Sequence, residues 1–275
     1  MRISIRNFVQ RSVFSAVILC LSVLAVAQEP STPMVPYDNF NRQFLDPNKW
    51  GTSSPCFTWT VLECVREIQN GQLRLAVRGY GTTNSNAGNQ YGESELQFNN
   101  PSRIKSIATQ LTVRRTSAAN CPASTDFNSG TQALVKGNFF NSGSGNPADD
   151  VEAFVLLNRL PTDPQGVLSV IGFLNWQGQF FDNIYLGTVN VGQKISVRLT
   201  WSQKTHQFVA AWTDLASGAV MQASMPYTVS DTTTAATPYK SLSVAVFTPN
   251  CVGTQMLVDD IETTFDNVMV GRLED

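Results

Sequence analysis

The stretch Lys194–Asp214, KISVRLTWSQKTHQFVAAWTD, decides the fold of this chain. Apolar and polar residues alternate along its first half and again along its second half, which is the period of a strand with one buried face. A short polar segment, Ser202–His206, joins the two halves. Two alternating runs with such a connection predict a β-hairpin. We expect its tryptophans, Trp201 and Trp212, in a core between two sheets, together with Trp50.

Further segments alternate in the same way, except that 151–157 and 167–174 are apolar on both faces, which predicts a central position in a sheet. Segments rich in glycine, proline, asparagine and serine separate the expected strands. No stretch of ten or more residues combines a helical period with caps, and there is no internal repeat. We therefore predict an all-β fold, a single antiparallel two-sheet β-sandwich. The further expected strands are 35–40, 73–77, 93–98, 107–113, 132–140, 151–159, 167–176, 184–189, 218–224, 242–248 and 264–270. The expected loops include 79–92, 119–130 and 230–238.

Residues 1–27 have the features of a secretory signal peptide. Three arginines precede the apolar run Val13–Val26, which is too short to span a bilayer comfortably, and a small-x-small cleavage site ends at Ala27. A lipoprotein signal with Cys20 as the lipidated residue is the alternative. Leu19 disfavours it, because a small residue is wanted before the lipidated cysteine. We expect a secreted, periplasmic or cell-surface protein with no transmembrane segment.

Cleavage after residue 27 would leave 248 of the 275 residues, divided into an extended lead-in, 28–36, and one sandwich domain, 37–272. Three of the 19 basic residues and none of the 21 acidic residues lie in the signal, so the formal charge of the remainder is −5. A mildly acidic chain without a basic run argues against a nucleic-acid partner.

Four cysteines remain after cleavage, and in an exported chain they predict two disulfides. Three pairings are possible. We favour Cys56 with Cys64, which flank a short segment, and Cys121 with Cys251, which would join two distant loops. Zinc is disfavoured, because no cysteine pair has ligand spacing and His206 is the only histidine.

Four stretches together resemble the concanavalin A-like lectin/glucanase superfamily, particularly its secreted bacterial laminin-G-like and glucanase-like members. They are Tyr37–Asn41 with Leu45–Trp50, Asn70–Leu75, Ile195–Trp212 and Phe265–Val270. The resemblance implies a jelly roll of two curved sheets with adjacent first and last strands. It also implies a concave face of the kind that often holds glycans.

Relatives in this superfamily often carry a structural calcium where the first and last strands meet. Asp38 and Asp266 lie in the matching stretches, and Asp259 and Asp260 lie in an expected acidic turn. Carboxylates are ligands that calcium prefers. The alternative is that Asp38 and Asp266 bond neighbouring backbone.

Glycoside hydrolysis needs two carboxyl groups that flank the scissile bond. Glucanases of this superfamily use Glu-x-Asp-x-Glu along one strand, and the nearest match is Glu93–Gln97, ESELQ. Gln97 replaces the last carboxylate by an amide, which is neither a general acid nor a base. Glu93 and Glu95 would stand about 7 Å apart on a strand, which does not exclude an inverting pair. Glu152, in the acidic cluster at 149–152, is the third catalytic candidate; the alternative for the first two is a solvated strand face.

Sugar binding requires aromatic platforms together with amides or carboxylates that bond hydroxyl groups. Trp176 ends a predicted central strand and is the expected platform, although packing against the sheet edge is the alternative. The candidate ligand-binding residues are Glu93, Glu95, Gln97, Glu152, Asn158, Asn175 and Trp176.

The sequence therefore predicts a secreted, non-catalytic carbohydrate-binding protein whose partner is a polysaccharide or other glycan. A polysaccharide-degrading hydrolase or lyase is the first alternative, and a cell-surface structural or adhesion domain is the second. Nucleophilic catalysis through His206 is disfavoured, because the residue lies in an expected turn and no Gly-x-Ser-x-Gly elbow is present. The only ion that we expect is calcium.

Overall fold

The computed structural model describes residues 33–51, 56–58, 62–124, 129–176, 179–253 and 255–272. The predicted signal peptide, with Cys20, lies outside the described residues, as does most of the lead-in. In the part of the chain that the structure describes, no helix is long and apolar enough to cross a membrane.

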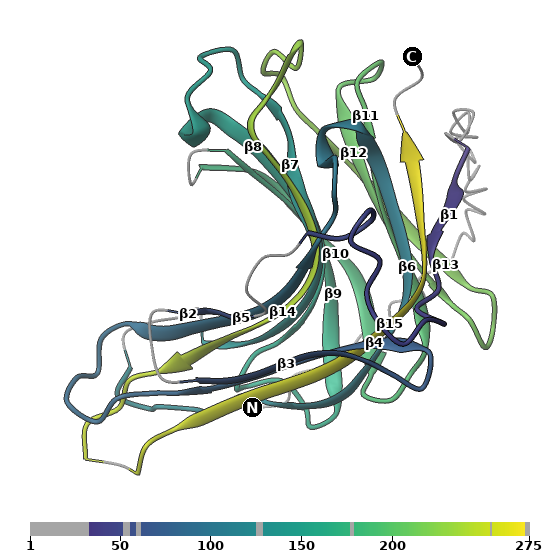
Figure 1. Ribbon diagram of the computed structural model, residues 1–275. Helices are drawn as coiled ribbons and strands as arrows, with labels where there is room; N and C mark the ends of the chain where they lie inside the picture. The colour runs from purple at the N-terminus through teal and green to yellow at the C-terminus, as the bar shows by residue number, and fades with distance from the viewer. Residues whose placement is uncertain are drawn as a thin grey trace, which may run out of the picture. The chain divides into compact units, whose positions relative to one another are not determined.

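Two antiparallel sheets make up the fold, which confirms the predicted β-sandwich (Figure 1). One has eight strands, in the order β13-β12-β11-β6-β15-β4-β3 with β1 beside β15, and the other has seven, in the order β10-β9-β8-β7-β14-β5-β2. The eight-stranded sheet contains β1 Val35–Asp38, β3 Leu62–Gln69, β4 Gln72–Tyr80, β6 Ile104–Ser117, β11 Ile195–Ser202, β12 Gln207–Asp214, β13 Val220–Pro226 and β15 Val258–Arg272. The seven-stranded sheet contains β2 Cys56–Thr58, β5 Asn89–Gln97, β7 Gly130–Asn141, β8 Asp150–Arg159, β9 Val167–Trp176, β10 Gln179–Asn190 and β14 Thr233–Pro249. The only helices among the described residues are two single turns of 3₁₀ helix, η1 Pro101–Arg103 and η2 Pro147–Asp149.

The predicted hairpin is β11 and β12, and its alternating residues face the other sheet. Trp201 and Trp212 are buried, as is Trp50, so the prediction that all three belong to the core is confirmed. The indole Nε1 of Trp212 donates to the carbonyl oxygen of Leu186, on β10 of the opposite sheet, at 2.8 Å. The hairpin therefore anchors one sheet to the other through a hydrogen bond as well as apolar contact.

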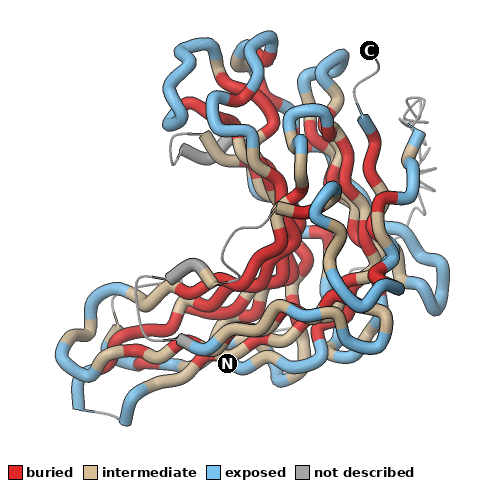
Figure 2. Tube along the Cα trace, viewed as in Figure 1, coloured by how far each residue is buried: buried red, intermediate tan, exposed pale blue. Residues whose placement is uncertain are grey.

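The main core fills the space between the two sheets, where the buried residues of Figure 2 lie. At Gly172 the sheets approach so closely that a Cβ there would stand 2.7 Å from the Cβ of Ala210. The first and last strands, β1 and β15, pair antiparallel, as the family resemblance implied.

Some strand boundaries differ from the prediction. The expected loop at 79–92 contains the start of β5, and the expected loop at 230–238 contains the start of β14. The register of β14 against β7 shifts between Thr234 and Tyr239. This irregularity allows the polar segment at the start of β14 to pair with β7. The short β2 and most of β3 were also missed, because pairing partners distant in sequence, rather than local alternation, define these segments.

Both disulfides have the favoured pairing, Cys56 with Cys64 and Cys121 with Cys251. Cys56 lies on β2 and Cys64 on β3, the edge strands of the two sheets. Cys121 follows β6 of the eight-stranded sheet, and Cys251 follows β14 of the seven-stranded sheet. Each disulfide therefore joins one sheet to the other.

One lysine is buried on the core side of the seven-stranded sheet. Lys240 is 1% exposed, its Nζ donates to the carbonyl oxygen of Asn138 at 3.1 Å, and it stands 4.3 Å from the centre of the Phe139 ring. A Cβ on Gly137 would lie 2.4 Å from Lys240 Cγ, so glycine is required opposite this side chain. Burial lowers the pKa of Lys240 to about 7.

We predict that Lys240→Met changes how stability depends on pH. Between pH 7 and about 10.4 the unfolded lysine binds a proton that the folded lysine has lost, so wild-type stability rises with pH in this window, by at most ~1.4 kcal/mol per unit. The free energy of unfolding of Lys240→Met should exceed that of wild type by the largest margin at or below pH 7, and this margin should shrink above pH 7. Urea unfolding of both proteins from pH 6 to 9 measures the difference. Parallel stability curves would contradict the prediction.

Candidate functional site

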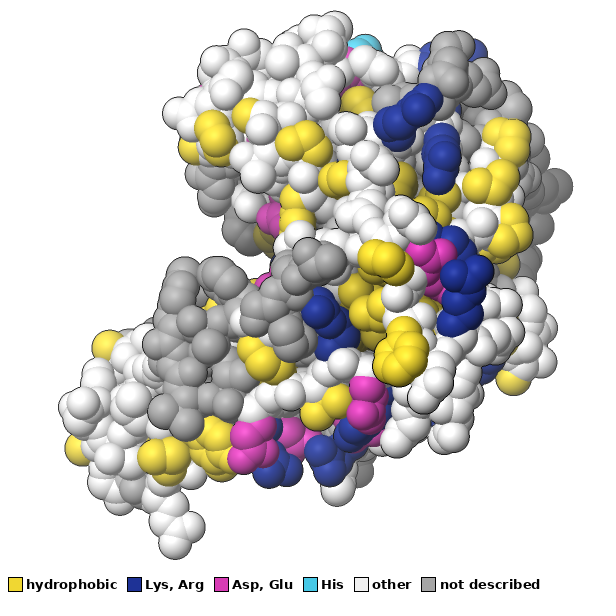
Figure 3. All heavy atoms as spheres, viewed as in Figure 1, with side chains coloured by type: hydrophobic (Ala, Val, Ile, Leu, Met, Phe, Trp, Pro, Cys, Tyr) yellow, Lys and Arg dark blue, Asp and Glu magenta, His cyan; other side chains and the backbone are white. Residues whose placement is uncertain are grey.

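The outer face of the seven-stranded sheet is the candidate site. In Figure 1 the strands of this sheet bend so that the face is concave, and Figure 3 shows the surface hollowed on the same side. Because paired residues of an antiparallel sheet share a face, the register defines which side chains it presents. Glu93, Glu95 and Gln97 lie here, with Leu96 and Phe98 in the core, as their alternation predicted.

An ion pair lies at the centre of this face. Lys136 Nζ stands 2.7 Å from Glu93 Oε1, and the Tyr91 hydroxyl donates to the other carboxylate oxygen of Glu93. Burial alone would lower the pKa of Lys136, but the charges of Glu93 and Glu152 outweigh it and hold the pKa above its usual value. Glu93 is 4% exposed, so its carboxylate depends on these partners.

A second carboxylate beside this pair is held by uncharged donors. The Gln97 amide donates to Glu95 Oε1 and the Tyr239 hydroxyl to Glu95 Oε2, each at 2.6 Å. Lys136 Nζ lies 5.4 Å from the centre of the Tyr239 ring, which connects this group to the ion pair. The amide of Gln97 cannot serve as the third carboxylate of a catalytic triplet. In the structure it instead positions the carboxylate of Glu95 through this hydrogen bond.

Glu152 joins the same cluster from β8, where it pairs in register with Asn175 of β9. Burial raises the pKa of its carboxyl group, the charge of Lys136 and a hydrogen bond with the Asn175 side chain offset part of the rise, and Glu93 adds to it. The structure therefore brings Glu93, Glu95, Gln97, Glu152 and Asn175 to one face, with Glu93 and Glu152 both close to Lys136.

Aromatic side chains lie beside the polar cluster. The rings of Phe154 and Phe173 stack with centroids 4.5 Å apart and an interplanar angle of 12°, and both are partly exposed. Tyr185 of β10 pairs with Ile171 on the same face and is 62% exposed. The apolar part of the face comprises Leu134, Leu156, Ala245, Tyr91, Phe154, Ile171, Phe173 and Phe247.

Two predicted ligand-binding residues do not join the cluster. Trp176 pairs with the buried Val151 and packs against the main core, so it lies on the opposite face of the sheet from its neighbour Asn175. This corrects its interpretation as a platform. Asn158 is on the concave face but pairs with Ser169, toward the far end of β8 from Glu152.

Sequence reasoning also missed residues that complete the site: Lys136, Tyr91, Tyr239, Phe154 and Phe173. The sequence predicted a strand at 132–140, but nothing local indicated that Lys136 has a carboxylate partner on a distant strand. The stacked pair could have been found from the outward positions of β8 and β9, had the register of these strands been known.

The residues expected to hold calcium have other partners. Asp38 accepts hydrogen bonds from the backbone N of Phe40 at 2.9 Å and from Trp50 Nε1 at 2.7 Å, one on each oxygen. Asp266 Oδ1 accepts from the backbone N of Asn267 at 2.7 Å. Calcium takes six to eight oxygen ligands, and the described residues contain no group of three or more acidic, histidine or cysteine side chains that could hold a metal. These contacts give no support to a calcium site, and calcium binding stays a prediction.

Asp259 and Asp260 lie in β15 rather than in the expected turn. Asp260 forms an ion pair with Arg115 at 2.8 Å. Asp259 is fully buried and accepts from the backbone N of Ala119, and burial raises its pKa to about 7.

The single histidine lies apart from this face, in the β11–β12 turn. His206 Nδ1 stands 3.0 Å from Asp231 Oδ2, and that oxygen also accepts from the hydroxyl of Tyr227 at 2.6 Å. The Tyr227 hydroxyl in turn accepts from Trp201 Nε1 at 2.7 Å. The network connects the turn to the core.

No family model and no curated protein matches the chain. It is similar to solved structures of lectins. Lectin II from Ulex europaeus shares 10% identity at a TM-score of 0.40, over 85% of this chain and 97% of the lectin. Winged bean acidic lectin complexed with methyl-α-D-galactose shares 13% sequence identity at a TM-score of 0.43, over 88% of this chain and 99% of the lectin. Arcelin-5, a lectin-like defence protein from Phaseolus vulgaris, shares 11% sequence identity at a TM-score of 0.36, over 88% of this chain and 99% of arcelin-5. Likeness at this level concerns the fold and carries no argument about a ligand.

We predict that Lys136→Met lowers the free energy of unfolding by roughly 3–5 kcal/mol, because it leaves the buried carboxylate of Glu93 without a counter-charge. The double variant Lys136→Met/Glu93→Gln should recover most of this loss. Urea unfolding at neutral pH measures both. Arg114→Met, which removes an exposed cation of β6, is the control and should stay within ~0.5 kcal/mol of wild type. A loss below about 1 kcal/mol for Lys136→Met would show that the ion pair does not hold this face together.

Proposed function

We propose that the concave face of the seven-stranded sheet binds carbohydrate. The observation that carries this proposal is a set of fixed polar groups beside the stacked, partly exposed rings of Phe154 and Phe173. Glu152 and Asn175 are partly exposed and offer oxygen and nitrogen atoms to sugar hydroxyl groups. The aromatic rings offer apolar surface to the face of a pyranose.

The charge of the cluster favours a neutral or amino-sugar polymer over an acidic one. Three carboxyl groups, of Glu93, Glu95 and Glu152, surround the single ammonium of Lys136. A uronate or sulfate placed beside them would be repelled, since like charges in a partly desolvated site are costly.

We further propose that the protein is exported, because its two disulfides are typical of oxidising compartments. This proposal agrees with the signal peptide that the sequence predicts.

Cleavage of the bound polymer is the second candidate function. One observation favours it: burial raises the pKa of Glu152, as a general acid requires, and another carboxylate, Glu93, lies near. Glu152→Gln separates the two functions. It should abolish any release of reducing ends if Glu152 is a general acid, while the amide still allows the polymer to bind.

Affinity electrophoresis through gels that contain β-glucan, xylan, galactan or alginate tests the binding proposal. We predict that at least one neutral polymer retards the mature protein and that alginate does not. Phe154→Ala should weaken the affinity obtained from the retardation about fivefold or more, since a ring contact contributes of the order of 1 kcal/mol beyond its buried area.

Glu67→Ala is the matched control for Glu152→Ala in the same gels. Both remove a glutamate, but Glu67 lies on β3 of the other sheet, where it pairs with Arg74. Only the first should weaken retardation, and a thermal melt of each variant establishes that it is folded. Absence of retardation by every polymer would count against carbohydrate binding and favour an adhesion or structural role.

A further inference from the structure

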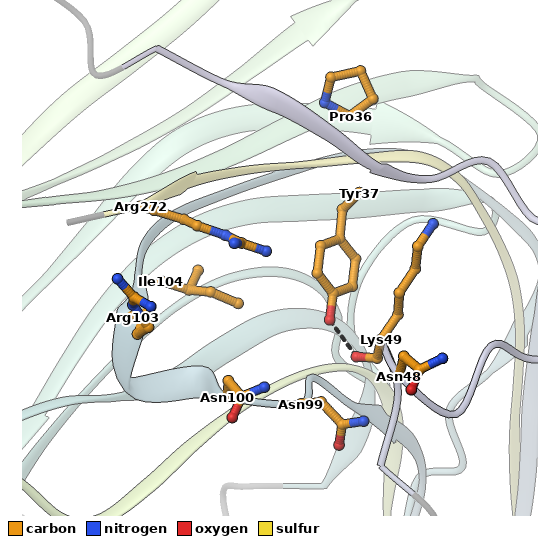
Figure 4. A pocket seen from close by; sticks show the side chains of 9 residues that line it. All are labelled: Pro36, Tyr37, Asn48, Lys49, Asn99, Asn100, Arg103, Ile104 and Arg272. Atoms are coloured by element: carbon orange, nitrogen blue, oxygen red, sulfur yellow. Dashed lines mark hydrogen bonds between the residues drawn. The ribbon is translucent and has the colours of Figure 1, made fainter. Parts of the chain in front are cut away.

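A second candidate binding site lies away from the carboxylates of the concave face, in a pocket of about 390 Å³ where the first and last strands meet the start of β6 (Figure 4). Residues from four places in the sequence line it, which only the fold brings together. They are Pro36, Tyr37, Asn48, Lys49, Asn99, Asn100, Arg103, Ile104 and Arg272.

The lining is cationic. Lys49, Arg103 and Arg272 contribute three positive charges, and none of the nine described residues that line the pocket is acidic. Among the described residues, no carboxylate lies within 4.0 Å of the charged groups of Lys49 or Arg272. In Figure 4 the guanidinium of Arg272 extends toward Tyr37, Arg103 lies farther from Tyr37 on the same side, and the ammonium of Lys49 lies on the other side of the Tyr37 ring.

Among the described residues, two carboxylates whose charge acts on Tyr37, those of Asp38 and Asp46, have partners elsewhere. Asp38 accepts from Trp50 Nε1 and from a backbone N, as described above. Asp46 accepts from the backbone N of Asn48 at 3.0 Å and pairs with Arg42 at 3.1 Å. Neither lines the pocket, so they do not neutralise its lining by direct contact.

The floor of the pocket is rigid. The carbonyl oxygen of Lys49 accepts from the Tyr37 hydroxyl and, at 2.8 Å, from the backbone N of Asn99. Tyr37 packs against Trp50 and Phe98, with ring centroids 5.1 Å away in each case. Burial raises the pKa of Tyr37 to about 12; the charge of Arg272 offsets part of the rise, and the charges of Asp38 and Asp46 add to it.

We propose that this pocket binds a tetrahedral oxyanion, a sulfate or phosphate group, through Arg272, with Lys49 and Arg103 adding positive charge to the lining. Guanidinium groups match the oxygens of such anions with paired N–H donors, and lysine adds a compact charge. The amides of Asn48 and Asn100 supply further donors, whereas that of Asn99 donates to the carbonyl oxygen of Pro47 at 2.6 Å. The oxyanion comes either from a free ion or from an ester on a polymer, and the two sources share the same chemistry.

Isothermal titration of the mature protein with sodium sulfate and with inorganic phosphate, at constant ionic strength in sodium chloride, tests the proposal. Arg272→Gln should weaken binding about tenfold or more, because hydrogen bonds between charged groups are the strong ones. Lys49→Gln should weaken it less, and added chloride should weaken it through screening.

Arg114→Gln is the matched control, since this arginine lies ten residues along β6 from Ile104, about 33 Å away, and is exposed. It should leave anion binding unchanged. Glu152→Ala should also leave it unchanged, so that the outcome is independent of carbohydrate binding on the concave face.

Gels that contain dextran sulfate or unmodified dextran distinguish the two sources. Extra retardation by the sulfated polymer that is lost in Arg272→Gln, without measurable binding of free sulfate, would assign the site to an ester on a polymer. Binding of the free ions that is also lost in Arg272→Gln would assign it to small oxyanions. Absence of both, or equal effects of Arg272→Gln and Arg114→Gln, would overturn the proposal.

Discussion

Each strand of the seven-stranded sheet must give one of its faces to the core, and this constraint determines what the other face can present. Residues such as Val155, Leu157 and Val170 fill the space against the eight-stranded sheet, and their neighbours in sequence then point outward. The outer face is therefore not free to be uniformly polar or apolar. It carries Leu156 and Phe154 beside Glu152, which is why fixed charges and exposed rings occur together there.

The charges on this face are stable because they satisfy one another across strands. In register Lys136 lies beside Ser241 and, beyond it, Gln97, yet its ammonium reaches Glu93 diagonally across β14. Tyr91 and Tyr239 add hydroxyl donors to the two glutamates. A buried carboxylate without these partners would be destabilising, so the cluster is a single unit rather than a set of separate side chains.

The sequence was sufficient for the sandwich and for the orientation of Glu93, Glu95 and Gln97, because both follow from the period of two. It was not sufficient for the partner of Lys136, which depends on β7, β14 and β5 being neighbours although they are distant in the chain. Trp176 was proposed as a platform, rather than as a residue that packs against the core, for a local reason. Both faces of Val167–Trp176 carry apolar residues, so alternation could not distinguish the core side from the outer side.

The two candidate sites have opposite charge, and the short segment that connects them explains how both remain rigid. Gln97 ends β5 on the concave face, Phe98 enters the core, and Asn99 already lines the cationic pocket. Phe98 and Trp50 form an isolated bridge with ring centroids 4.7 Å apart. This aromatic contact fixes the backbone on both sides of Phe98. The acidic residues of the concave face and the basic residues of the pocket are therefore separated in space. The mild net negative charge of the chain does not indicate this separation, because composition carries no information on position.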